Sequence, residues 1–276
     1  TAQGGIGTAD EDDFLHRQYE LDSTGWGSPF LLVPEATTVD DDTLNALVHA
    51  KQTGLVLSNN SPLGVRFYHL SGTSADTEKA ARISAGRPGS PCTEKHLAFN
   101  TEFTTQPICT ASRKYQQLKI AQLNSLNLSP EDFESNYKKV TEKECLCIGL
   151  SNSAAAVYQV PFLPKLKAVT VCPGPNLLYF DQVVSLKTMI DHIYGRTDLL
   201  AGKVRPHMFI AELNLYIDYL KELIEPASCQ EADAKTRKYV SSFYNNLKDG
   251  IRYYRQLPGL TEDQRHQFII DLNLAE

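Results

Sequence analysis

Glycine-rich turns on either side of a short predicted helix are the part of this sequence best suited to bind an anion. The first turn is Gln3-Gly4-Gly5-Ile6-Gly7-Thr8, and the second is Gly25-Trp26-Gly27-Ser28-Pro29-Phe30. Glycine lets the backbone approach a ligand closely, and unpaired N–H groups at a helix start point toward an anion. Together the two turns predict a phosphate site. The alternative is two ordinary loops that need positive φ, and the acids from Asp10 to Asp13 favour it because they would repel a phosphate that they faced.

Cysteine is the second residue type that could carry chemistry. Cys145-Leu146-Cys147 forms a closely spaced pair, and Cys92, Cys109 and Cys172 lie beside proline or glycine turns. Thiolates from separated turns can hold zinc or an iron–sulfur cluster. No pair has two residues between its cysteines, so we expect buried thiols in a reduced protein. A metal site and a redox disulfide stay as alternatives.

Other motifs fall short of their templates. Gly149-Leu150-Ser151-Asn152-Ser153 lacks the last glycine of a hydrolase nucleophile elbow. The stretch from Gly195 to Lys203 has neither the spacing nor the hydroxyl of a nucleotide phosphate loop. The histidines are expected to be surface or hydrogen-bonded core side chains, namely His16, His49, His69, His96, His192, His207 and His266.

The elements that must position these residues are mostly helical. Capping patterns at Thr8, Asp40, Ser129 and Thr261 each predict the start of a helix. Apolar stripes within 207–225 and 230–256 are typical of core-facing helices, with a groove for a partner as the alternative. Further helices are expected over 76–84, 111–126 and 182–194. Short apolar runs over 29–34, 145–150 and 169–172 predict strands.

Composition and charge exclude several classes of protein. The chain has 276 residues, 42% hydrophobic and 22% charged, and its net charge is -6. An ordinary globular composition argues against disorder, and the negative charge argues against a nucleic-acid-binding surface. No apolar run reaches the roughly 20 residues of a membrane helix. Without a secretion signal, and with few cysteines, a cytoplasmic setting is expected.

The first 36 residues resemble the end of an FMN-dependent barrel. Gly4-Gly5-Ile6, the helix after it, Gly27-Ser28-Pro29-Phe30 and Pro34-Glu35-Ala36 are similar to the nitronate monooxygenase (2-nitropropane dioxygenase-like) flavoenzymes. In that family a glycine pair after strand 7 and a Gly-Thr pair after strand 8 hold the FMN phosphate. The resemblance therefore implies FMN binding by Gly4, Gly5, Gly27 and Ser28, with serine in place of threonine. The closest likeness is to a branch with a long C-terminal extension.

The resemblance covers only the last part of a barrel. It implies an α/β, helix-dominated chain that holds the last β/α units of a TIM-type FMN barrel over 1–45 and a mostly helical extension over 46–276. The family's catalytic histidine lies upstream of the glycine pair, so no catalytic residue carries over. Because the sequence opens at Thr1 inside a strand-to-helix turn, we expect a fragment, a processed chain or a cut one, inactive by itself.

Three functions follow as hypotheses. The first is a part of an FMN-dependent oxidoreductase, a monooxygenase or an enoyl-reductase-like flavoprotein, with a small-molecule substrate such as a nitronate or an enoyl thioester. The second is a helical binding or assembly module, which acts as a lid, an oligomerisation surface or a docking site for an acyl carrier. The third is a metal or cluster protein that uses the cysteines. In the first, the missing barrel segment or a second copy of the chain is expected to cover the open strand edges.

Overall fold

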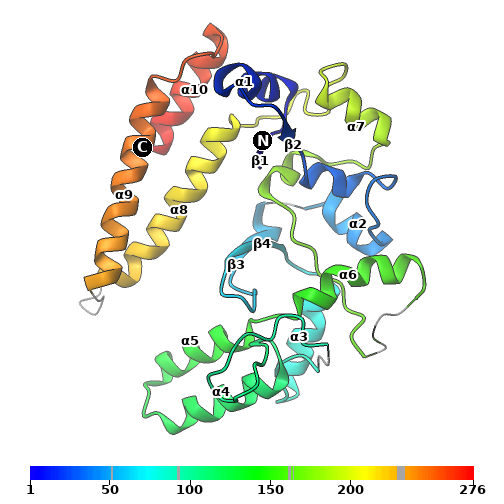
Figure 1. Ribbon diagram of the computed structural model, residues 1–276, viewed down its shortest axis with the longest axis vertical. Coiled ribbons are helices and arrows are strands. Elements are labelled where there is room, and N and C mark those ends of the chain that lie inside the picture. Colours follow the sequence, from blue (N-terminus) through cyan, green and yellow to red (C-terminus); the bar gives the residue numbers. More distant parts are fainter. Residues whose placement is uncertain (51, 92–93, 161–162, 164, 229–233) are drawn as a thin grey trace. The chain divides into compact units, whose positions relative to one another are not determined.

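The computed structural model describes residues 1–50, 52–91, 94–160, 163, 165–228 and 234–276 (Figure 1). This part of the chain is α/β and dominated by helices, as predicted, and it contains no closed barrel. It forms two compact units, one of residues 1–27 with 187–276 and one of residues 28–186. The division at residue 45, between a barrel part and an extension, lies inside the second unit and stays a prediction.

A small β-α-β unit opens the first compact unit. Strand β1 (Ala2–Gln3) leads into helix α1 (Ala9–Tyr19), and strand β2 (Thr24–Gly25) follows. The two strands pair in parallel, with Ala2 opposite Thr24 and Gln3 opposite Gly25. Helix α1 begins where the sequence predicts, because the Thr8 side chain accepts a hydrogen bond from the Glu11 N–H.

Long helices complete the first unit. They are α7 (Leu186–Ile193, whose first residue belongs to the other unit), α8 (Met208–Ser228), α9 (Ala234–Arg255) and α10 (Glu262–Ala275). Helices α8 and α9 run antiparallel side by side, and α10 packs against both (Figure 1). The apolar stripes predicted in 207–225 and 230–256 supply much of the core, in which Phe14 of α1 packs with Leu213, Ile251 and Phe268.

The second unit is built around a β-hairpin and helices. Strands β3 (Leu55–Ser58) and β4 (Phe67–Leu70) pair antiparallel. The helices are α2 (Asp41–Val48), α3 (Ser74–Ser84), α4 (Arg113–Ser125), α5 (Pro130–Thr141) and α6 (Leu146–Val157). Asp40 and Ser129 cap α2 and α5 as predicted, since each side chain accepts an N–H from the first turn. Within the described ranges, no helix combines the length and the apolar character needed to cross a membrane.

Two of the predicted strands are helical. Residues 28–32 form a 3₁₀ helix in which Pro29 and Leu32 are buried, so the apolar run marks core contact and not a strand. Residues 145–150 open helix α6. A short apolar run cannot be assigned to strand or helix by its period alone, and this run continues into three alanines, Ala154 to Ala156, which favour helix.

The third predicted strand, 169–172, is extended but joins no sheet in the described chain. Its backbone groups are bonded by other elements. The Val169 carbonyl accepts from Ala75 N at 3.2 Å, the Val171 carbonyl accepts from Leu70 N at 3.2 Å, and Thr170 N donates to Gly149 O at 3.1 Å. Because these partners come from three different segments, no ladder forms.

Candidate functional site

Parallel pairing places the two glycine turns at one edge of the β1–β2 sheet. Because Gln3 lies opposite Gly25, the segment through Gly4 and Gly5 leaves β1 beside the point where the chain leaves β2 toward Gly27. Gly4 and Gly5 have φ of 102° and 74°, a region that favours glycine. A Cβ built on Gly4 or on Gly27 would meet no described atom within 4 Å. Open space therefore lies over both turns, at the strand ends where α/β proteins bind ligands.

Ser28, the fourth predicted site residue, opens the second compact unit. Its hydroxyl oxygen accepts a hydrogen bond from the Gly174 N–H at 2.7 Å. The hydroxyl keeps its own proton, which it can still donate. The structure thus brings Gly4, Gly5 and Gly27 together at one sheet edge and gives the Ser28 side chain a protein partner.

A buried ion pair fixes the first glycine turn. Glu11 Oε1 accepts from Arg205 Nη1 at 2.6 Å and from Met208 N at 2.7 Å, and Glu11 Oε2 accepts from Gly7 N at 2.8 Å. Arg205 also donates to the Gly5 carbonyl at 2.5 Å. The Glu11 and Arg205 side chains are only 5% and 6% exposed. The acid whose carboxylate binds the turn is therefore paired with a cation from the segment before α8.

A side chain at position 7 would disturb the same pair. A Cβ built on Gly7 would lie 2.6 Å from Arg205 Cζ, so the end of the Arg205 side chain would have to shift. The Gly7 carbonyl accepts from His192 Nε2 at 2.9 Å, and His192 Nδ1 accepts from Leu199 N at 3.2 Å. This histidine is buried with a hydrogen bond at each ring nitrogen, as expected for a core side chain.

The other acids of the helix start have separate surroundings. Asp12 accepts hydrogen bonds from the Thr24 hydroxyl and, at 3.5 Å, from the Trp26 indole. It thereby joins α1 to the end of β2. Asp10 and Asp13 are exposed. Repulsion of an anion at the turn, the objection raised by the sequence, is reduced because the buried acid is paired and Asp12 is hydrogen-bonded.

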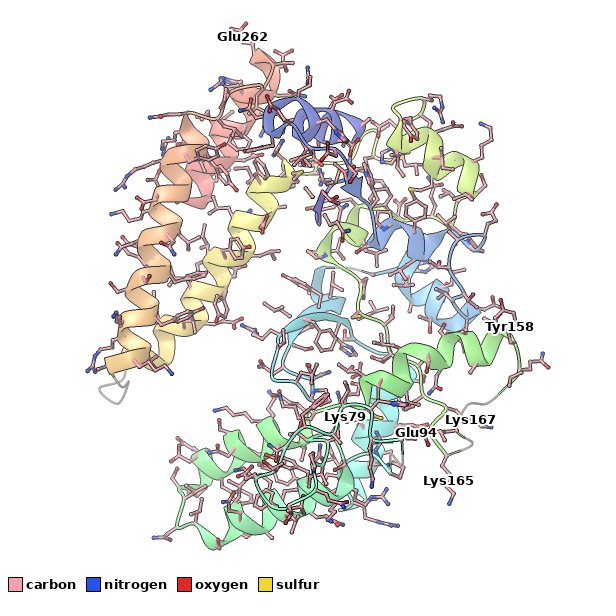
Figure 2. All side chains as sticks on the ribbon, viewed as in Figure 1. Lys79, Glu94, Tyr158, Lys165, Lys167 and Glu262 are labelled. Carbon is pink, nitrogen blue, oxygen red and sulfur yellow. The ribbon has the colours of Figure 1, made fainter. Side chains whose placement is uncertain are left out.

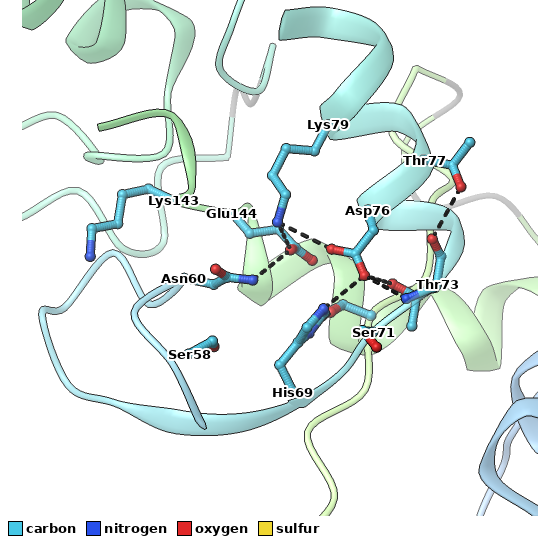
Figure 3. A network of polar contacts seen from close by, with 12 residues as sticks. Ser58, Asn60, His69, Ser71, Thr73, Asp76, Thr77, Lys79, Lys143 and Glu144 are labelled. Carbon is cyan, nitrogen blue, oxygen red and sulfur yellow. Dashed lines mark hydrogen bonds and ion pairs between the residues drawn. The ribbon is translucent and has the colours of Figure 1, made fainter. Parts of the chain in front are cut away.

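A second cluster of charged side chains lies in the other unit, where β4, α3 and the segment before α6 meet (Figure 3). His69 Nε2 lies 2.9 Å from Asp76 Oδ2. Lys79, carried by α3 (Figure 2), lies between two carboxylates, with its Nζ 3.2 Å from Asp76 Oδ1 and 3.1 Å from Glu144 Oε2. The side chains of His69 and Glu144 are 4% and 3% exposed.

Three side chains of this cluster have the chemistry of metal ligands. His69, Asp76 and Glu144 each offer one atom, all within 4.8 Å of one another, and one imidazole with two carboxylates suits a divalent cation. The ammonium group of Lys79 already lies between the two carboxylates and supplies the positive charge. The geometry therefore favours an ion-pair core that ties β4, α3 and α6 together.

The cluster also resembles a catalytic triad in outline. His69 Nδ1 lies 3.4 Å from the Thr170 hydroxyl, so an acid, an imidazole and a hydroxyl follow in order. A nucleophile must reach its substrate, however, and Thr170 is 2% exposed. The hydroxyl is enclosed by protein, which supports a structural role.

Sequence reasoning missed this cluster. The sequence predicts a surface or hydrogen-bonded core role for His69, and no motif in it marks Asp76 or Glu144. The three residues come from separate elements, and Glu144 lies 75 positions after His69 (144 − 69 = 75). No local spacing connects them, so only the tertiary fold reveals the cluster.

The cluster should make the second unit sensitive to acid. Burial raises the pKa of Asp76, but the hydrogen bond from His69 and the charges of His69 and Lys79 outweigh it, and the net pKa lies well below its usual range. A carboxylate whose pKa is lowered by folding stabilises the fold at pH values above its pKa in the unfolded chain, about 3.9. This contribution is lost as the pH falls below that value toward the pKa in the folded chain. We expect the urea concentration at the midpoint of unfolding to decrease as the pH is lowered below about 4. The midpoint of the Asp76→Asn variant should depend less on pH in this acid range. The same pH dependence in the variant and the parent chain would contradict this expectation.

The cysteines do not gather into a metal site within the described chain. Cys109, Cys145, Cys147 and Cys172 are thiols there, and the one group of potential metal ligands contains no cysteine. The Cys145–Cys147 pair lies at the start of a helix, where residues two apart point in different directions. Desolvation raises the pKa of the Cys172 thiol above its ordinary value. Cys92 lies outside the described residues.

Compared with protein-family models, with curated proteins and with solved structures, the chain gives no match. The function therefore has to be argued from the geometry of the sites.

Proposed function

We propose that residues 1–28 form the phosphate-binding end of an FMN-dependent (β/α)₈-barrel oxidoreductase of the nitronate monooxygenase type. One observation carries the proposal. The parallel register of β1 and β2 aligns Gly4–Gly5 and Gly27 at one sheet edge, with open space beside Gly4 and Gly27. Barrels of this class bind phosphate in the loops after their last two strands.

The residues present fit a flavin phosphate. The backbone N–H groups of Gly4, Gly5, Gly27 and Ser28 are the donors that we assign to it, and left-handed φ at the first two lets the backbone approach closely. The Glu11–Arg205 pair holds the turn in place and compensates the charge of the acid that binds Gly7 N. When bound, the flavin supplies the redox chemistry, while the protein orients its phosphate. The proposal assigns no catalytic residue within this chain, and its substrate is a small molecule such as a nitronate or an enoyl thioester.

Comparison of FMN with riboflavin tests the proposal, because the two differ only in the phosphate. We expect the chain to bind FMN at least about tenfold more tightly than riboflavin, as measured by quenching of flavin fluorescence. The double variant Gly4→Ala with Gly5→Ala should lose this preference, since both residues have positive φ.

Gly64→Ala provides the matched control. Gly64 has the same φ as Gly5, 74°, and a Cβ there meets no described atom within 4 Å. The control thus carries a similar backbone cost in the other compact unit and should keep the FMN preference. Equal binding of FMN and riboflavin, or binding of neither, would overturn the proposal.

A further inference from the structure

An aromatic cavity in the first unit has no role in the function proposed above. It lies among α1, α8 and α9 and has a volume of about 640 Å³, within the range of small-molecule sites. Six aromatic side chains line it, namely Tyr19, Phe209, Tyr216, Phe243, Tyr253 and Tyr254.

The planes of these rings have different orientations. Phe209 and Tyr254 are stacked, with centroids 5.3 Å apart and planes 2° apart. Phe243 stands nearly perpendicular to Tyr216, at 84° and 6.2 Å. Aromatic faces carry partial negative charge, and a group of rings in different orientations is the usual site for an organic cation.

Carboxylates strengthen the negative character of the cavity. Glu212 Oε1 accepts a hydrogen bond from the Tyr216 hydroxyl at 2.5 Å, and this bond raises the pKa of Tyr216 to about 12. Burial, followed by the charge of Glu212, raises the pKa of Tyr254 to about 12. Of the two carboxylates, Asp249 lines the cavity and pairs with Arg252, whereas Glu212 acts on the cavity through its bond to Tyr216. No lysine or arginine is among the described residues that line it.

Gly250 gives a position at which a side chain can be introduced into the cavity. It lines the cavity from inside helix α9, where glycine is less favourable than alanine. A Cβ built there would meet no described atom within 4 Å, so alanine fits and a longer side chain would enter the cavity.

We propose that this cavity binds an organic cation with a methylated ammonium group, held by the aromatic side chains that line it and by the charge of Glu212 behind Tyr216.

Choline and 3,3-dimethylbutan-1-ol test the chemical class, because the alcohol has nearly the same shape but carries carbon in place of the charged nitrogen. Titrations followed by NMR of the tyrosine and phenylalanine rings should show saturable choline binding. The alcohol should bind at least about tenfold more weakly, a difference of about 1.4 kcal/mol. Equal affinities, or no binding of choline, would overturn the proposal.

Two variants separate charge from space. Glu212→Gln keeps an acceptor for Tyr216 but removes the charge, so choline affinity should fall several-fold while binding of the alcohol is unchanged. Gly250→Leu should fill the cavity and abolish choline binding, whereas Gly250→Ala should keep it and raise Tm. Retained choline binding in Gly250→Leu, with a normal helical circular dichroism spectrum, would show that the site lies elsewhere.

Discussion

Replacing Lys79 by methionine should lower the free energy of unfolding of residues 28–186 by about 3–5 kcal/mol. Methionine keeps the length of the side chain but leaves Asp76 and Glu144 without the cation that separates them. Glu144 is almost fully buried, and its Oε1 has no hydrogen-bond partner within the described chain. Without Lys79, its Oε2 would keep a 3.3 Å hydrogen bond from the neutral side chain of Asn60 and no cation among the described contacts. Urea denaturation of the variant and the parent chain measures the loss.

An exposed ion pair in the same unit gives the control. Lys119 Nζ lies 2.6 Å from Glu102 Oε1, with side chains 27% and 34% exposed. Lys119→Met should cost no more than about 1 kcal/mol, since solvent screens this pair. Adding Glu144→Gln to the Lys79→Met variant should restore part of its stability. Equal losses in the two methionine variants would contradict a special role for the buried cluster.

Replacing Arg205 by methionine should cost the first unit a similar amount, about 3–5 kcal/mol. The variant loses the hydrogen bonds to Glu11 and to the Gly5 carbonyl and leaves a carboxylate in the core. It should also weaken the binding of FMN relative to that of riboflavin, because the first glycine turn would lose its hydrogen bond from Arg205 and lie next to an uncompensated carboxylate. Denaturation and the flavin titration measure the two effects separately.

Arg205→Lys and Arg255→Met are suitable comparisons. Lysine keeps the charge but cannot reproduce the two-pronged contact of arginine, so an intermediate loss is expected. Arg255 forms an exposed pair with Glu276 at the end of α10, and its removal should cost less than about 1 kcal/mol. A loss of stability in Arg205→Met no larger than in Arg255→Met would exclude the buried pair as a determinant of the turn.

Helix positions follow from local signals in this sequence, whereas strand positions do not. Thr8 and Thr261 each accept the backbone N–H that their capping patterns predict, because a cap depends on residues within one turn. The segment 145–150 shows the limit of such signals. Its apolar residues suit a strand or a buried helix equally, and the tertiary contacts decide.

The candidate sites show the same limit. The glycine turns are visible in the sequence because they lie within a few residues of a capped helix. The sequence does not show that the charge of Glu11 is compensated, because its partner Arg205 lies 194 residues later. The sequence therefore indicates where an anion could bind but not how the nearby acids are compensated.

The discontinuous first unit has a consequence for biosynthesis. Residues 1–27 can complete their fold only with residues 187–276, so the whole of residues 28–186 must leave the ribosome in between. At translation rates of about 5–20 residues per second, that interval lasts roughly 10–30 s. Throughout it, Phe14 and Leu15, which are buried in the finished unit, lack the core partners that α8, α9 and α10 supply. Residues 1–27 are thus the segment on which a chaperone would act during synthesis.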